Sequence, residues 1–322
     1  MFKQILGKIL NQFDPNLKNS YELLNKEINS GEGSFEKLLL PSELNFDINV
    51  IQYFKSHPTF NLVSGLGSDR NLEAAYVKAI VEYFERLAFF ENEHKLGLTS
   101  TNGIAAHPYL AMAKKMAMDE MFERDAFLRH WYTQIPFHKI DLSAKSKELK
   151  QNLERLNLDL ILAVTHLGYQ KVVCAFLLDL KSGGFALGLS SGRDKQDEDK
   201  AIFEAIINYF FGHGGKSKET LISELKNNEI SSLEHHRSFW LYDQKFPDFM
   251  IATGNQVTPP RYPDLKGKTE YHVLRDDKLK IVKMSNENLI ELSVGDVSKS
   301  KVSLTKIDLN GLVGPFKYHP IP

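Results

Sequence analysis

Two stretches of the sequence carry the same arrangement of acidic and basic residues. "AIVEYFERLAFF" (79–90) and "AMDEMFERDAFL" (117–128) each contain a Glu-x-x-Glu-Arg core inside an otherwise apolar segment. In a helix, side chains three residues apart share a face, so the two carboxylates of each core project together. The arginines, Arg86 and Arg124, lie four residues after the first glutamate and could form ordinary helical ion pairs. The glutamates are Glu82 and Glu85 in the first stretch and Glu120 and Glu123 in the second.

The apolar neighbours of these carboxylates point to more than a surface ion pair. A helix that is apolar most of the way round is usually buried, and buried carboxylates must be paired or bound to a metal ion. Four carboxylates brought together would repel one another unless cations share their site. Oxygen ligands suit Mg²⁺, which proteins usually hold with a few carboxylates and the phosphates of a substrate. The two motifs therefore predict a Mg²⁺–nucleotide site, and salt-bridged amphipathic helices are the simpler alternative.

A polar loop between the two motifs could contribute to such a site. "TSTNG" (99–103) supplies hydroxyl groups, the amide of Asn102 and backbone N–H groups just before the second helix. Groups of this kind can bind a phosphate or a ribose.

Composition limits the function classes. The chain has 322 residues, 42% hydrophobic and 25% charged, with a net charge of −1, so nothing favours non-specific binding of nucleic acid. Cys174 is the single cysteine, which suits a reducing compartment. No apolar run reaches the roughly 20 residues of a membrane span. The first residues, "MFKQILGKILNQF", lack the features of a signal peptide, so we expect a cytoplasmic protein.

Periodicity predicts a mixture of long helices and short strands. The ranges 1–30, 70–95, 109–131 and 197–211 read as helices, with Asp69 or Asn71 capping the second. The segment 169–192 reads as two strands joined by a turn at Ser182-Gly183-Gly184. This mixture predicts an α+β (mixed α/β) fold.

The motifs together resemble those of the YcaO family. That family carries Ser-x-x-Glu-x-x-Glu-Arg, then Ser/Thr-x-x-Asn-Gly-x-Ala-Ala-Gly followed by Glu-x-x-Glu-Arg-Asp-Ala. The stretches "GLGSDRNLEAAYVKAIVEYFER" (65–86) and "TSTNGIAAHPYLAMAKKMAMDEMFERDAF" (99–127) are similar, and the interval from Asn102 to Glu120 matches. The likeness covers roughly residues 60–215, and the final "HPIP" resembles the proline-rich end of the family.

The resemblance implies a YcaO-like fold in which helices carrying paired glutamates pack on small sheets. It divides the chain into an N-terminal helical segment (1–55), a nucleotide-binding core (56–215) and a C-terminal part of the same domain (216–322). It implies ATP and Mg²⁺ as cofactors, with the four glutamates as metal ligands. Thr99 and Asn102 would lie near the nucleotide, with Arg86 and Arg124 in support. The carboxylate of Pro322 would serve in proton transfer.

The implied reaction is ATP-dependent activation of a peptide backbone amide. A Cys, Ser or Thr side chain of the peptide, or an external sulfide, attacks the amide, and the product is an azoline or a thioamide, as in bacteriocin maturation. A precursor peptide would be the substrate. A separate peptide-recognition protein is the expected partner. The sequence leaves a homodimer open.

Some positions depart from the family pattern. Ala79 replaces a serine, Leu66 a lysine, and His107 and Met112 a glycine and a glutamate. The third family motif has Glu, then Gln three residues on and Arg two further. An ungapped alignment places Asn208, Phe211 and His213 there. These departures raise the alternative of a catalytically degenerate YcaO domain that acts as a binding or scaffold subunit.

Overall fold

The computed structural model describes the chain as two compact units, which we treat separately. Unit 1 comprises residues 1–39, 47–118 and 269–285, and unit 2 comprises 40–46, 119–268 and 286–322. The described residues are 15–98, 100–191, 196–211, 219–220, 222–223, 239–243, 245–252, 265–290, 292 and 321.

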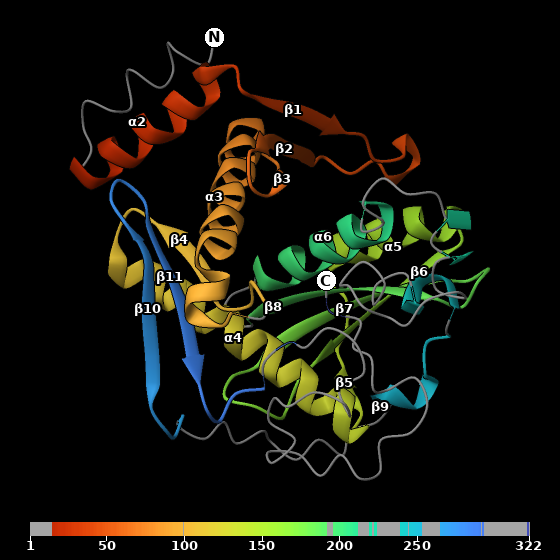
Figure 1. The fold of residues 1–322 in the computed structure, drawn as a ribbon. Helices are drawn as coiled ribbons and strands as arrows, with labels where there is room; N and C mark the ends of the chain where they lie inside the picture. The colour runs from red at the N-terminus through yellow and green to blue at the C-terminus, as the bar shows by residue number, and fades with distance from the viewer. Residues whose placement is uncertain are drawn as a thin grey trace. The chain divides into compact units, whose positions relative to one another are not determined.

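Unit 1 is built from two small sheets and a long helix (Figure 1). The first sheet is antiparallel with strand order β1-β2-β3, and the second has the order β10-β11-β4. The elements are α2 (Pro15–Ser30), β1 (Gly33–Leu38), β2 (Asn49–His57), β3 (Asn61–Asp69), α3 (Leu72–Leu96), β4 (Ile104–His107), β10 (Thr269–Asp276) and β11 (Lys280–Asn286).

Helix α3 forms as its ends predict and lies very close to β3. The side chain of Asn71 accepts a hydrogen bond from the N–H of Ala74, which confirms the predicted cap. Gly65 and Gly67 let the helix approach. A Cβ at Gly65 would lie 2.1 Å from the carbonyl oxygen of Ala79, so only glycine fits at that position. The strand therefore presents its backbone directly to the helix.

Unit 2 contains a five-stranded sheet with the order β8-β7-β6-β5-β9. All neighbours pair antiparallel except β5 and β9, which are parallel. The strands are β5 (Phe137–Lys139), β6 (Leu158–Val164), β7 (Val172–Asp179), β8 (Phe185–Ser191) and β9 (Ile251–Ala252). The helices are α5 (Ala144–Arg155), α6 (Gln196–Phe211), the short η1 (Ser42–Leu44), η2 (Phe239–Asp243) and η3 (Asp248–Met250), and α4 (Leu110–Thr133), which enters unit 2 at Asp119.

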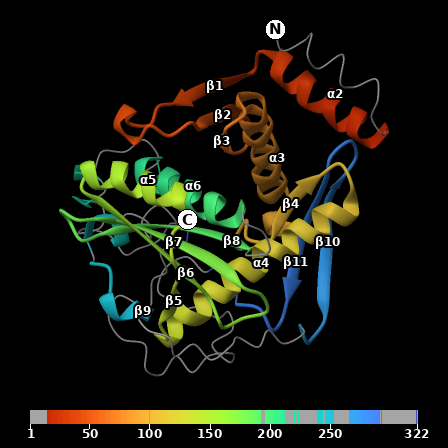
Figure 2. The ribbon, with the colours of Figure 1, turned by 180° about the vertical axis from the view of Figure 1, so that it is seen from behind.

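Helices cover both faces of this sheet, as Figure 2 shows from behind. Along β7, Cys174 and Phe176 join the core that includes α4, whereas Ala175 and Leu177 join the core beneath α5 and α6. Side chains of a strand alternate between faces, so a strand covered on both sides must be apolar throughout. This explains why β7, with the sequence VVCAFLLD, is apolar on both of its faces. The turn predicted within the segment 169–192 is also present, with Gly183 at a φ of +78°.

The predicted mixed α/β class is confirmed, and the predicted long helices appear as α3, α4 and α6. Within the segment 1–55, the described helix ends at Ser30 and the strands β1 and β2 follow. Among the described residues, no helix has the length and apolar character that crossing a membrane requires.

Replacing Gly188 by alanine is expected to destabilise unit 2. The added methyl group would lie 2.0 Å from the carbonyl oxygen of Ala201 in α6, and such overpacking costs about 1–3 kcal/mol. Both tryptophans of the chain, Trp131 and Trp240, lie in the core of unit 2, so their fluorescence reports its unfolding in urea. Lys147→Ala, on the exposed face of α5 in the same unit, is the control. Equal midpoints for the two variants would contradict the close approach.

Candidate functional site

In unit 1, α3 directs both glutamates of the first motif at strand backbone. The carboxylate of Glu82 accepts from the N–H of Leu66 at 2.8 Å and from Arg86 Nη2 at 2.5 Å. The predicted helical ion pair is therefore present. Glu85 accepts from the N–H of Ala106 in β4 at 2.6 Å. These hydrogen bonds orient both carboxylates toward the strand backbone.

The loop between the motifs holds a buried amide with no hydrogen-bond partner. Asn102 is 1% exposed, and neither its Oδ1 nor its Nδ2 has a partner among the described residues. The hydroxyl of Ser100 is likewise buried and has no hydrogen-bond partner among the described residues. A buried polar group without a partner costs about 1–3 kcal/mol, so native proteins rarely keep one without a reason. A ligand rich in hydrogen-bonding groups, such as a nucleotide, would satisfy these atoms.

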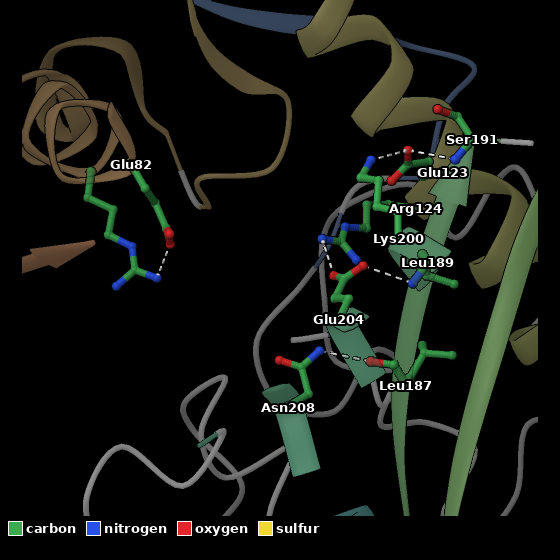
Figure 3. A network of polar contacts seen from close by, with 10 residues as sticks. Glu82, Glu123, Arg124, Leu187, Leu189, Ser191, Lys200, Glu204 and Asn208 are labelled. Carbon is green, nitrogen blue, oxygen red and sulfur yellow. Dashed lines mark hydrogen bonds and ion pairs between the residues drawn. The ribbon is translucent and has the colours of Figure 1, made fainter. Parts of the chain in front are cut away.

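In unit 2, the second motif meets helix α6 and the end of β8 (Figure 3). Glu123 is 6% exposed, accepts from the N–H of Ser191 at 2.8 Å, and lies 3.5 Å from Lys200 Nζ. Arg124 Nη2 lies 3.5 Å from a carboxylate oxygen of Glu204. Within the described part of the chain, Nε and Nη1 of Arg124 are buried without a partner. Two guanidinium donors are thus left for a ligand.

Burial opposes the charged forms of both Glu123 and Arg124, and their charged neighbours offset this to different degrees. Burial raises the pKa of Glu123 above its ordinary value, and the nearby Lys200 and Arg124 only partly offset this. Burial also opposes the charge of Arg124, but Glu204, Glu120 and Glu123 together raise its pKa. The guanidinium therefore stays charged. A divalent cation beside Glu123 would favour its ionised form in the same way.

Each unit contains a helix glutamate that accepts a hydrogen bond from the N–H of a strand residue directly after a glycine, which we call a helix–strand clamp. Glu82 of α3 binds the N–H of Leu66, which follows Gly65, and Glu204 of α6 binds the N–H of Leu189 at 2.9 Å, which follows Gly188. The helices carry the related stretches "KAIVE" (78–82) and "KAIFE" (200–204).

This correspondence identifies a residue that the sequence analysis missed. The ungapped alignment placed the third motif at Asn208, but the amide of Asn208 donates to the carbonyl of Leu187 at 2.8 Å. Glu204, whose carboxylate accepts from the N–H of Leu189, offers an alternative register that begins four residues earlier. The repeated Lys-Ala-Ile-x-Glu pattern was the signal available in the sequence. In the new register, Ile207 and Tyr209 occupy the positions of the family's Gln and Arg.

The predicted metal ligands are distributed over the two units. Glu82 and Glu85 belong to unit 1, and Glu120 and Glu123 belong to unit 2. The described residues contain no group of three or more His, Cys, Asp or Glu side chains placed to hold a metal ion. Thr99, His213 and Pro322 lie outside the described residues.

Comparison with known proteins places the chain in a family. The model of the family described as YcaO cyclodehydratase, ATP- and Mg²⁺-binding, matches residues 90–275, which is more than half of the chain. This chain belongs to the YcaO family. The cofactors predicted from the sequence, ATP and Mg²⁺, are those of the family. No curated protein sequence matches the chain.

Solved YcaO structures share the fold. YcaO from Methanopyrus kandleri, bound with AMPPCP and Mg²⁺, matches with a TM-score of 0.58 and 14% identity, over 89% of this chain and 96% of that one. A heterocyclase in complex with substrate and cofactor matches with a TM-score of 0.57 and 13% identity, over 90% of this chain and 54% of that one. A chain of the E. coli microcin synthetase McbBCD complex matches with a TM-score of 0.52 and 13% identity, over 80% of this chain and 88% of that one.

Arg124→Lys is expected to weaken binding of Mg²⁺–ATP about tenfold or more. Lysine keeps the positive charge but cannot reproduce the planar donors Nε and Nη1, and a hydrogen bond to a charged group contributes about 1.5–3 kcal/mol. Isothermal titration calorimetry measures the affinity. Arg155→Lys on the exposed face of α5 is the matched control. Equal affinities for the two variants would show that the two buried nitrogens do not face the nucleotide.

Proposed function

We propose that this protein uses ATP to activate backbone amides of a ribosomally made peptide. The observation that carries the proposal is the set of buried polar atoms without partners, at Asn102 in unit 1 and at Arg124 in unit 2. Arg124 directly follows Glu123, which is held by the N–H of Ser191, and Asn102 lies four residues before Ala106, whose N–H holds Glu85. Membership of a family of ATP- and Mg²⁺-binding cyclodehydratases supports the same function.

The roles of the residues follow from their chemistry. The carboxylates of both motifs, Glu82 and Glu85 with Glu120 and Glu123, would hold Mg²⁺, which takes few protein ligands and keeps the phosphates as others. Asn102 would bind the nucleotide by its amide, with Thr99 beside it. Arg124 would bind phosphate oxygens, whereas Arg86 orients Glu82. We further propose Glu204 as a charge partner that orients Arg124.

Mg²⁺–ATP, when bound, supplies a phosphoryl group that converts the amide oxygen into a leaving group. A side chain of the peptide attacks the amide carbon, the oxygen departs as phosphate, and an azoline and ADP remain. With an external sulfide as nucleophile, the product is a thioamide. Donors fixed in advance suit this chemistry, because phosphoryl transfer depends mainly on positioning and electrostatic stabilisation.

Pro322 remains the proposed proton-transfer group. Its neighbour Ile321 is fully buried in the core of unit 2. The division into 1–55, 56–215 and 216–322 also remains a proposal. A precursor peptide is the proposed substrate and a separate recognition protein the proposed partner.

A catalytically degenerate YcaO domain is the second candidate. The observation that favours it is the third motif, where Ile207 and Tyr209 replace Gln and Arg and the amide of Asn208 is engaged by Leu187. Such a subunit could keep nucleotide binding and lose turnover.

Release of phosphate from ATP in the presence of Cys- or Ser-containing peptides is the direct test. Glu123→Gln is expected to lower the rate on the order of 100-fold, because an amide is a poor ligand for Mg²⁺. Glu154→Gln, on the exposed face of α5, is the matched control. Addition of sulfide separates the two product classes.

Nucleotide binding without peptide-dependent release, with candidate partner proteins present, would favour the scaffold. Absence of nucleotide binding by the wild type would contradict both the proposed enzymatic function and the proposed nucleotide site.

A further inference from the structure

A buried lysine in unit 1 has no role in the site so far. Lys283 lies in the middle of β11, opposite Ile104 of β4, and is 4% exposed. Its ammonium group donates a hydrogen bond to the backbone carbonyl of Asn102. Lysine is almost never fully buried unless it is paired, so its place beside this loop calls for an explanation.

The loop that Lys283 contacts is a tight turn. The N–H of Ile104 donates to the carbonyl of Thr101 at 3.0 Å, which closes a four-residue turn over 101–104. Gly103 has a φ of +72°, whereas Asn102 is not among the residues with positive φ. These values define a type II turn, whose central peptide links Asn102 to Gly103.

Strand β11 holds both carbonyls of this part of the turn. Lys283 binds the carbonyl of Asn102, and the N–H of Met284 donates to the carbonyl of Gly103 at 2.8 Å. Type I and type II turns differ by a flip of the central peptide, and glycine at position 103 can adopt either. The bond to the Asn102 carbonyl therefore selects one orientation of that peptide.

We propose that Lys283 is a positioning residue for nucleotide binding, because it locks the turn in which the amide of Asn102 faces its ligand. The inference rests on the proposed nucleotide site. The side-chain amide of Asn102 has no hydrogen-bond partner among the described residues, so its direction follows from the backbone that carries it. A flipped central peptide would shift that backbone, although Asn102 itself would be unchanged.

The alternative is a lysine that serves stability alone. The two roles differ in what a methionine at this position would do. Methionine fills a similar volume but removes the charge and the hydrogen bond to the Asn102 carbonyl. A purely structural Lys283 would therefore affect unfolding, whereas a positioning Lys283 affects the affinity for nucleotide at equal stability.

The test compares Lys283→Met and Lys283→Arg with Lys280→Met. Lys280 lies on the same strand, but its ammonium group contacts Asp276 and the carbonyl of Asp277, in the β10–β11 hairpin. We expect Lys283→Met to weaken Mg²⁺–ATP binding about tenfold in calorimetry. Lys283→Arg, which keeps a charged donor, should recover most of the affinity. Lys280→Met should bind as the wild type does.

Hydrogen exchange without nucleotide gives an independent measurement. The N–H of Gly103 belongs to the central peptide that flips, so its exchange rate should change in Lys283→Met and not in Lys280→Met. If Lys283→Met also lowers stability, exchange elsewhere in unit 1 measures that general loss. A change at the turn beyond this reference is then specific to the turn. Wild-type affinity and exchange in Lys283→Met would overturn the inference while the proposed function stands. No binding by the wild type would overturn both.

Discussion

A carboxylate that accepts a hydrogen bond from strand backbone is the contact on which each unit depends. In unit 1 Glu82 of α3 binds the N–H of Leu66, and in unit 2 Glu204 of α6 binds the N–H of Leu189. Both contacts require glycine just before the bonded residue, because the helix backbone lies where a Cβ would stand. A hydrogen bond of this kind contributes about 1.5–3 kcal/mol, and it also fixes how the helix lies across the strand.

The carboxylates of these clamps have both a structural and a proposed functional role. The carboxylates that fasten the helices are those proposed to bind Mg²⁺ or to orient the arginines. Backbone donors hold these groups in one orientation before any ligand arrives, which lowers the reorganisation that binding requires. The cost is visible at Glu123, whose burial raises its pKa. If Glu123 holds a cation as proposed, the bound cation would relieve that cost and stabilise the folded protein.

In the part of the chain that the structure describes, the side chains of Asn102 and Arg124 keep unsatisfied buried atoms, and Arg124 contacts Glu204. Arg124 keeps two buried nitrogens without partners among the described residues, and Asn102 keeps its whole amide. Elsewhere the polar groups of the same loops are engaged, such as the carbonyls of Asn102 and Gly103 by β11. The backbone of these loops is therefore fixed, whereas the side-chain atoms remain for the proposed ligand.

The sequence alone determined the mixed α/β class, the long helices, the Asn71 cap and the paired glutamates, because periodicity and spacing are local properties. It also identified the family, since the motifs lie on continuous segments. The Lys-Ala-Ile-x-Glu repeat hinted at a register starting at Glu204, but the similarity of Glu204 and Glu82 became clear only from the strand N–H that each carboxylate reaches. The role of Lys283 was equally hidden. It lies 181 residues after Asn102, and only the pairing of β11 with β4 brings its ammonium group to that carbonyl.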